Sequence, residues 1–178
     1  MDERYNFYKD QYFFELERKQ NLSANLSIPI GFLTVIFSSY AYFGLNAHTL
    51  IVNWTLLPLS ALLAFSIFFS TKASYLLYKT FRGLKYGYVP NIKKIRDYEI
   101  QLNKHISNKG NNKEAELNEK FFNNIKNSLV NTTSVNRNNN NSRSNFLYKI
   151  NIFTFYSILF IILSSVPFFL LSFSWWTT

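Results

Sequence analysis

Basic side chains alternate with aromatic ones after the second apolar run of the chain, and two arginines stand further on in an acid-free stretch rich in Asn. Ammonium and guanidinium groups bind phosphates, while aromatic rings stack on nucleobases. The predicted polyanion-binding residues are Lys79, Arg82, Lys85, Tyr86, Tyr88, Arg137 and Arg143. The same side chains can instead snorkel toward lipid headgroups, and both interpretations stay open.

Hydroxyl groups within the first two apolar runs are the second set of side chains with a chemical role to consider. At helical separations they let helices approach closely, or they line a wet path through a membrane. Pro58 adds a hinge candidate in the second run. The predicted pore or gate residues are Ser38, Ser39, Tyr40, Pro58, Ser60, Ser66 and Ser70.

Residues that would support catalysis or transport are missing from the apolar runs. The runs offer hydroxyls without His, Asp or Glu to activate them, and they carry no charge that would couple transport to an ion. The chain has no Cys, and it lacks the HExxH, P-loop and GxSxG patterns. We therefore expect neither an enzyme nor a secondary transporter, and no metal or cofactor.

The apolar runs themselves predict a membrane protein. Residues 28–71 contain no Lys, Arg, Asp or Glu, and a turn signal at residues 44–49 divides them. About 20 apolar residues in a helix cross a bilayer, so this stretch crosses twice. Residues 150–176 supply a third span. Pro29 fits the first turn of the first span, where a helix tolerates proline.

The distribution of charge predicts the topology. Of 19 Lys and Arg residues, 15 lie within residues 72–149 together with five acids, while the turn between the first two spans has none. The positive-inside rule then places the N-terminus and residues 72–149 in the cytoplasm and the C-terminus outside. The net charge of +9 suits this excess, or a surface that binds anionic lipid or nucleic acid.

Outside the spans, periodicity predicts three more helices. Residues 1–26 form an amphipathic helix with Tyr5, Tyr8, Tyr12 and Leu16 on one face. Residues 91–106 and 113–130 form a cytoplasmic helical hairpin around a turn at residues 107–112. The first of these two has Ile92, Ile95, Tyr98 or Glu99, and Leu102 on its apolar face. The second has one apolar stripe, formed by Leu117, Phe121, Ile125 and Leu129.

Residues 131–145 are rich in Asn and contain no acid. This composition predicts a flexible or disordered loop, or else part of an anion site. The predicted segments are therefore an amphipathic helix at 1–26, a transmembrane hairpin at 27–71, a basic cytoplasmic segment at 72–149 and a third span at 150–176. The fold class is an all-α membrane protein, and a pore would need several copies in a symmetric homo-oligomer.

Four short runs of this sequence resemble a known group of proteins. Residues 12–19 and 28–34, the exit from the second span at 85–90, and residues 141–147 are similar to small membrane effectors of bacterial anti-phage systems. The channel effectors of the Hailong system come nearest, and SLATT effectors share the order of a helix followed by two spans.

This resemblance implies a tetramer-like channel in the bacterial inner membrane. The channel would be kept shut by a nucleotide-derived ligand, such as a single-stranded DNA oligomer made by a partner nucleotidyltransferase. Loss of the ligand would open the pore and depolarise the cell. The alternative is a membrane scaffold whose basic loop docks anionic lipid or a protein partner.

Overall fold

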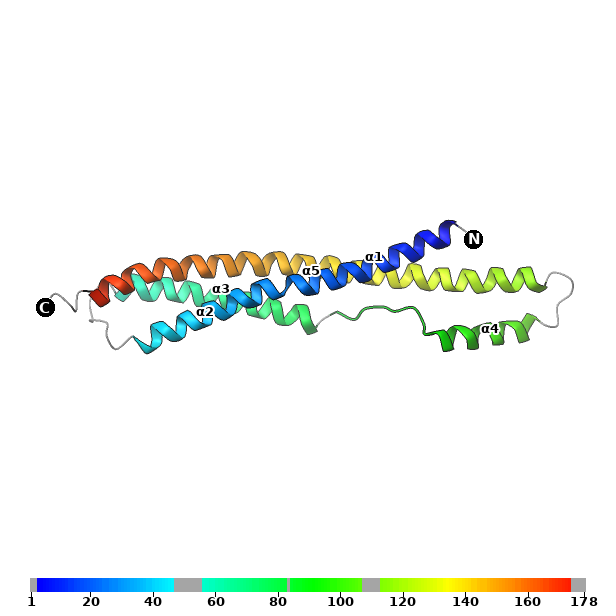
Figure 1. Cartoon of the computed structure of the whole chain (residues 1–178), viewed down its shortest axis with the longest axis horizontal. Helices are drawn as coiled ribbons and strands as arrows, with labels where there is room; N and C mark the ends of the chain where they lie inside the picture. The colour runs from blue at the N-terminus through cyan, green and yellow to red at the C-terminus, as the bar shows by residue number, and fades with distance from the viewer. Residues whose placement is uncertain (1–2, 47–55, 83, 107–112, 174–178) are drawn as a thin grey trace. The chain divides into compact units, whose positions relative to one another are not determined.

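The computed structural model describes residues 3–46, 56–82, 84–106 and 113–173, which form five α-helices and no strand (Figure 1). The helices are α1 (Glu3–Asn25), α2 (Ser27–Leu45), α3 (Leu56–Arg82), α4 (Ile92–Ile106) and α5 (Lys113–Phe173). Three stretches are long and apolar enough to cross a membrane: Glu3–Leu45, Leu56–Arg82 and Lys113–Leu171. The predicted all-α class and the three apolar helices are confirmed. The turn predicted at residues 44–49 begins inside α2, which ends at Leu45, while residues 47–49 and the turn predicted at 107–112 lie outside the described residues.

The chain folds as two compact units. Unit 1 comprises Met1–Gln20 and Lys85–Asn141, and unit 2 comprises Asn21–Leu84 and Ser142–Thr178. The last turns of α3 lie within unit 2, and most of the Asn-rich stretch lies within unit 1.

Proline explains why α1 and α2 are separate helices. Pro29 has no N–H to donate to the carbonyl of Asn25, and its ring crowds that carbonyl. Accordingly α1 ends at Asn25, and α2 begins at Ser27 after Leu26. Leu26 itself keeps right-handed helical angles (φ −69°, ψ −20°), so the direction of the chain changes little at this junction.

Pro58 is the third residue of α3 as the structure describes it, from Leu56 onward. Within this described helix a proline at that position removes no intrahelical hydrogen bond. The proline that does lie inside a helix is Pro167 of α5, which leaves the carbonyl of Leu163 without its usual donor. Any bend caused by proline is therefore expected in α5 rather than in α3.

The predicted Asn-rich loop is wrong, because residues 131–145 form the middle of α5. This helix joins the predicted third cytoplasmic helix to the third span without interruption. Its buried residues recur every seventh position: Leu129, Asn136, Arg143, Ile150, Ser157, Ser164 and Leu171. Such a repeat is typical of helices that wrap around one another in a left-handed sense. Composition misleads here because Asn and Arg occupy positions that are usually apolar.

The other long helices share this repeat. On α3, Leu59, Ser66, Ala73 and Thr80 are buried at seven-residue spacing. On α1 the buried face continues from Tyr12 to Glu15, which is 3% exposed, while Leu16 is only half-buried. The prediction for Leu16 assumed a 3.6-residue period, whereas the helix packs with a 3.5-residue one.

The apolar stripes predicted for residues 91–106 and 113–130 are largely confirmed. On α5, Leu117, Phe121 and Ile125 are half-buried and Leu129 is buried. On α4 the less exposed face holds Ile95, Tyr98, Leu102 and Ile106. Ile92 does not belong to this face, since it is 84% exposed in the first turn.

The core of unit 2 is apolar and lies between α2, α3 and α5. One cluster contains Leu33, Ile36, Ala73 and Ile150 together with Leu26. A second cluster contains Leu59, Phe168 and Leu171. Rings of α3 and α5 also stack, with the planes of Phe69 and Phe160 inclined by 6° at a centroid distance of 5.7 Å. These contacts hold the three helices in register.

Candidate functional site

The extended segment between α3 and α4 is held by the Asn-rich part of α5 in unit 1. We call residues 85–90 the strap. The Gly87 N–H donates to Asn136 Oδ1 at 2.8 Å, and Asn136 Nδ2 donates back to the Gly87 carbonyl at 3.0 Å. Asn139 Nδ2 donates to the Lys85 carbonyl at 2.7 Å. Side-chain amides thus supply the backbone partners that a neighbouring strand would supply in a sheet.

Gly87 allows the strap to approach α5 closely. A Cβ atom at this position would lie 3.3 Å from both Cα and Cβ of Thr132. That separation is tighter than ordinary van der Waals contact, so a larger residue would push the strap away from Asn136. The glycine therefore serves close approach, and its φ angle is not positive.

Asn140 connects α1, the strap and α5. Its Nδ2 donates to the Glu15 carbonyl at 2.7 Å and to Glu15 Oε2 at 2.8 Å, while its Oδ1 accepts from the Tyr86 hydroxyl at 2.7 Å. Both Asn140 and Glu15 are buried. The Val89 N–H also donates to the Tyr12 hydroxyl, at 3.4 Å. A fully bonded buried network of this kind specifies one arrangement of the three segments.

Lys19 of α1 lies against both tyrosines of the strap. Its Nζ is 4.6 Å from the ring centroid of Tyr86 and 5.3 Å from that of Tyr88, and it donates to the Tyr88 hydroxyl at 2.8 Å. A cation over an aromatic face is attracted by the ring quadrupole. The two rings predicted to stack on a ligand are therefore engaged by a cation of the chain itself.

The seven predicted polyanion-binding residues are divided between the two units. Unit 1 holds Lys85, Tyr86, Tyr88 and Arg137, and unit 2 holds Lys79, Arg82 and Arg143.

Their environments differ as well. Arg143 is 7% exposed and its Nη1 donates to Ser23 Oγ at 3.1 Å, so it packs within unit 2, whereas Arg137 is exposed on α5. Lys79 Nζ lies 5.2 Å from the Phe146 ring centroid, and the Arg82 guanidinium lies over the Tyr78 ring and donates to its hydroxyl.

Three of the predicted pore or gate residues meet in a buried hydroxyl cluster of unit 2. The Tyr40 hydroxyl lies 2.7 Å from Ser66 Oγ, 3.2 Å from Ser70 Oγ and 3.3 Å from Ser157 Oγ. Ser66 and Ser157 also donate to each other's carbonyls, at 2.8 and 3.0 Å. We call Tyr40, Ser66, Ser70 and Ser157 the hydroxyl cluster. It joins α2, α3 and α5 through hydrogen bonds inside an apolar bundle.

The remaining hydroxyls of that predicted set bond to their own helices. Ser38 donates to the Thr34 carbonyl at 2.9 Å, Ser39 to the Val35 carbonyl at 3.0 Å and Ser60 to the Leu57 carbonyl at 2.9 Å. A hydroxyl bonded in this way can face lipid or water without an unsatisfied donor. The structure therefore separates the predicted set into an inward cluster and outward single hydroxyls.

Sequence reasoning missed Asn136, Asn140, Lys19 and Ser157. Asn136 and Ser157 lie on the seven-residue repeat of α5, so a search for that period would have found both. Asn140 occupies the second inward position of the same repeat, four residues after Asn136. Nothing in the local sequence marks Lys19, because its partners on the strap are far away in the chain.

The described part of the chain is all-helical and has three stretches that are long and apolar enough to cross a membrane. Comparison with protein-family models, curated proteins and solved structures finds no match. Within the described ranges no three His, Asp or Glu side chains gather into a group that could hold a metal ion.

Proposed function

We propose that the chain is the subunit of a homo-oligomeric membrane channel that is gated from its cytoplasmic face by a nucleotide-derived ligand. Opening would depolarise a bacterial inner membrane, as the resemblance to anti-phage effectors implies. The proposal assigns the chain no catalytic role. A tetramer, a single-stranded DNA ligand and a partner nucleotidyltransferase belong to the same proposal.

A difference between two outward helix faces supports a channel. The outward face of α2 carries the hydroxyls of Thr34 and Ser38 beside Gly31, where a Cβ would meet nothing within 4 Å, together with the exposed apolar side chain of Val35. The outward face of α5 is apolar and exposes Phe155, Leu159, Ile162, Val166 and Leu170. Lipid suits the face of α5, whereas the hydroxyl face of α2 suits a wet path formed by several copies.

The strap supports control from the cytoplasmic side. It follows α3 in the chain. It is bonded to Asn136, Asn139 and Asn140 of α5, and its Val89 N–H donates to the Tyr12 hydroxyl of α1. A ligand that favours or breaks these bonds would act on the segment next to a membrane-spanning helix. Because an equilibrium shifts only by differential affinity, the ligand must prefer one state of the strap.

Membrane potential in bacteria tests the channel. The wild-type chain is expressed alone and with a partner nucleotidyltransferase, and a potential-sensitive dye is recorded. Ser38→Leu is expected to reduce depolarisation because it makes the α2 face apolar. Ser165→Leu is the matched control, since this hydroxyl also bonds its own helix but lies on α5. An unchanged potential in every combination, with monomeric protein in detergent, would contradict the channel.

Salt dependence tests the polyanion ligand. Binding of a short single-stranded DNA is measured on the full-length protein at rising salt. The logarithm of the binding constant should fall with the logarithm of salt, with a slope of about −0.7 for each phosphate contacted. A binding constant that does not change with salt concentration would rule out phosphate contacts.

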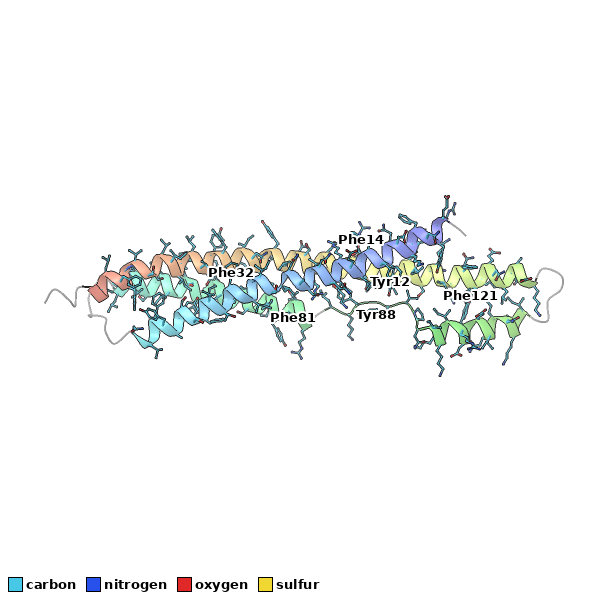
Figure 2. All side chains as sticks on the ribbon, viewed as in Figure 1. Tyr12, Phe14, Phe32, Phe81, Tyr88 and Phe121 are labelled. Atoms are coloured by element: carbon cyan, nitrogen blue, oxygen red, sulfur yellow. The ribbon has the colours of Figure 1, made fainter. Side chains whose placement is uncertain are left out.

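Exposed aromatics beside cations favour the scaffold as a second candidate. Phe81, in the last turn of α3 between Lys79 and Arg82 in the sequence, is 62% exposed (Figure 2). Such side chains are typical of the boundary between headgroups and water. The scaffold would leave the membrane potential unchanged, while anionic lipid would stabilise the wild type more than the Lys79→Gln/Arg82→Gln double variant.

A further inference from the structure

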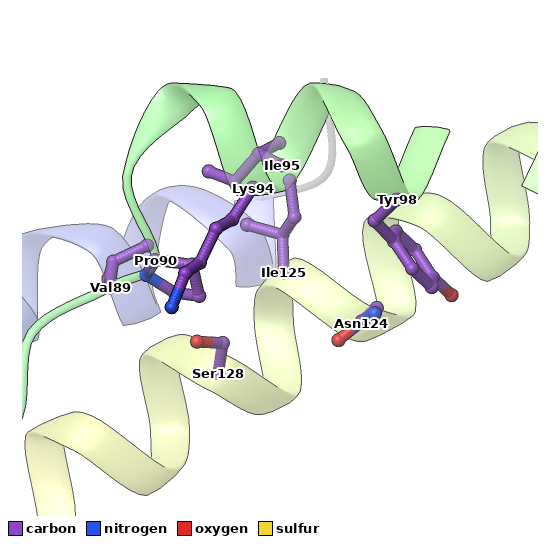
Figure 3. Close-up of a pocket in the computed structure, with 8 residues that line it drawn as sticks. All are labelled: Val89, Pro90, Lys94, Ile95, Tyr98, Asn124, Ile125 and Ser128. Carbon is purple, nitrogen blue, oxygen red and sulfur yellow. The ribbon is translucent and has the colours of Figure 1, made fainter. Parts of the chain in front are cut away.

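A cavity of about 180 Å³ lies in unit 1 between α4, α5 and the end of the strap. Ile95 of α4 and Ile125 of α5 face each other across it, and Val89 and Pro90 close one end (Figure 3). Tyr98 and Asn124 flank the other end. An apolar cavity of about 150 Å³ accommodates a benzene molecule, so this one has room for a single ring or a short aliphatic chain.

Among the eight lining residues of this cavity, Lys94 is the one cationic side chain. Lys94 extends from the first turn of α4 toward Ser128 and Pro90 (Figure 3). None of the eight lining residues is acidic, and among the described residues Lys94 has no carboxylate within ion-pair distance. Its place in the first turn of α4 adds the positive end of the helix dipole. The cavity thus combines an apolar body with an unpaired positive charge at its rim.

From this geometry we infer a binding site for a small organic anion, with one ring or a short apolar chain and a single phosphate or carboxylate group. The apolar part lies between Ile95 and Ile125. The anionic group binds Lys94, with Ser128 as a second hydrogen-bond donor. Asn124 offers a polar contact to the far edge of a ring, and the ring of Tyr98 flanks that edge.

Such a ligand would touch three segments at once. Val89 and Pro90 belong to the strap, whose other residues are bonded to Asn136 and Asn140. Occupancy would therefore hold the end of the strap between α4 and α5. The effect of this site on gating rests on the proposed function. Binding of the ligand does not depend on whether the chain forms a pore.

Three probes separate the two halves of the site. Equilibrium dialysis against the full-length protein in phosphatidylcholine nanodiscs, with empty nanodiscs as the blank, measures phenyl phosphate, inorganic phosphate and benzyl alcohol. Phenyl phosphate carries both ring and anion, whereas the other two carry one each. We expect phenyl phosphate to bind with a dissociation constant on the order of 1 mM, a usual range for fragments of this size. Each of the other probes should bind at least about tenfold more weakly, because a charge-assisted contact is lost or the apolar part is missing.

Benzoate, compared with phenyl phosphate, shows whether the site prefers a carboxylate or a phosphate.

Two pairs of variants locate the binding. Lys94→Met removes the charge but keeps the length of the side chain, and Lys93→Met is its exposed neighbour outside the cavity. Ile125→Trp fills the cavity, and Ile100→Trp adds the same ring to an exposed position of α4. The first member of each pair should weaken phenyl phosphate about tenfold or more, while the second should not. Circular dichroism and elution volume check that each variant is folded.

The outcomes are distinct from those of the channel test. Equal binding of all three probes, or loss of binding in both members of a pair of folded variants, would overturn the site. No binding of phenyl phosphate to a protein that still depolarises cells would overturn the site and leave the channel standing. Binding that Lys94→Met and Ile125→Trp abolish, in a protein that never depolarises cells, would support the site and contradict the channel.

Discussion

At the scale of single residues, the amide of Asn140 makes more contacts between segments than the Asn-rich composition indicates. It donates hydrogen bonds to the backbone carbonyl and to the carboxylate of Glu15, and it accepts one from the Tyr86 hydroxyl. The Asn140 side chain is 0% exposed. Its removal leaves several buried polar atoms without a partner. An unsatisfied buried group costs about 1 to 3 kcal/mol, which is more than a hydrogen bond contributes on average.

Asn140→Ala is therefore expected to lower the free energy of unfolding by about 2 to 4 kcal/mol and to expose the strap. Hydrogen exchange of the strap amides, above all the Gly87 N–H, should accelerate. Asn138→Ala is the matched control because Asn138 is exposed on the same helix, and it should change stability by less than about 0.5 kcal/mol. Equal exchange in both variants would show that Asn140 does not hold the strap.

The hydroxyl cluster gives a second expectation at this scale. Tyr40→Phe keeps the ring but removes the hydroxyl that reaches Ser66, Ser70 and Ser157. Polar contacts between membrane helices are worth about 0.6 kcal/mol on average and up to about 1.7 kcal/mol. We expect a loss in that range, measured as the free energy of unfolding in detergent. Tyr42→Phe, two residues on and exposed, should lose nothing; an equal loss would contradict the role of the cluster.

At the scale of elements, the helicity of residues 131–145 has the sharpest consequence. Arg137 faces outward on α5, so its side chain can be replaced without disturbing the core. Arg137→Ala should leave stability nearly unchanged. Arg137→Pro should cost about 3 kcal/mol or more, because it removes a backbone hydrogen bond and crowds the carbonyl of Thr133. Circular dichroism and unfolding in detergent measure both, and a tolerated proline would show that this stretch is not a continuous helix.

Elements were predictable from the sequence where their packing is apolar. The spans follow from long apolar runs without charge, whereas α4 and the stripe of Leu117, Phe121, Ile125 and Leu129 follow from hydrophobic periodicity. The middle of α5 did not, because Asn136, Asn140 and Arg143 occupy inward positions and remove the apolar signal. Their hydrogen bonds to the strap and to α1 replace the missing apolar contacts. Most of these hydrogen-bond partners are at least 50 residues away in the chain.

The candidate site was less predictable than the fold for the same reason. Residue type predicted the cations and rings as groups able to bind a polyanion, but it could not indicate which side chains of the chain itself contact them. Lys19 lies over Tyr86 and Tyr88, and Arg143 is buried beside Ser23. Lys94 is not among the predicted polyanion-binding residues, because only the packing of α4 against α5 places it beside an apolar cavity.

At the scale of the whole molecule, the charge distribution predicts which ends of the helices face the cytoplasm. The chain has no Cys and two His residues, one in each region whose side is in question. His48→Cys places a thiol in the uncharged turn between the first two spans, and His105→Cys places one at an exposed position near the end of α4. In intact cells a membrane-impermeant maleimide should label His48→Cys through the periplasm, whereas His105→Cys should react only after the inner membrane is permeabilised. Both variants have the same cysteine-free background and are treated with the same reagent. If both thiols react fully in detergent, a difference between them in intact cells reports their location. Labelling of His105→Cys in intact cells would reverse the topology and would place the strap and the Lys94 cavity outside, where a cytoplasmic ligand could not reach them.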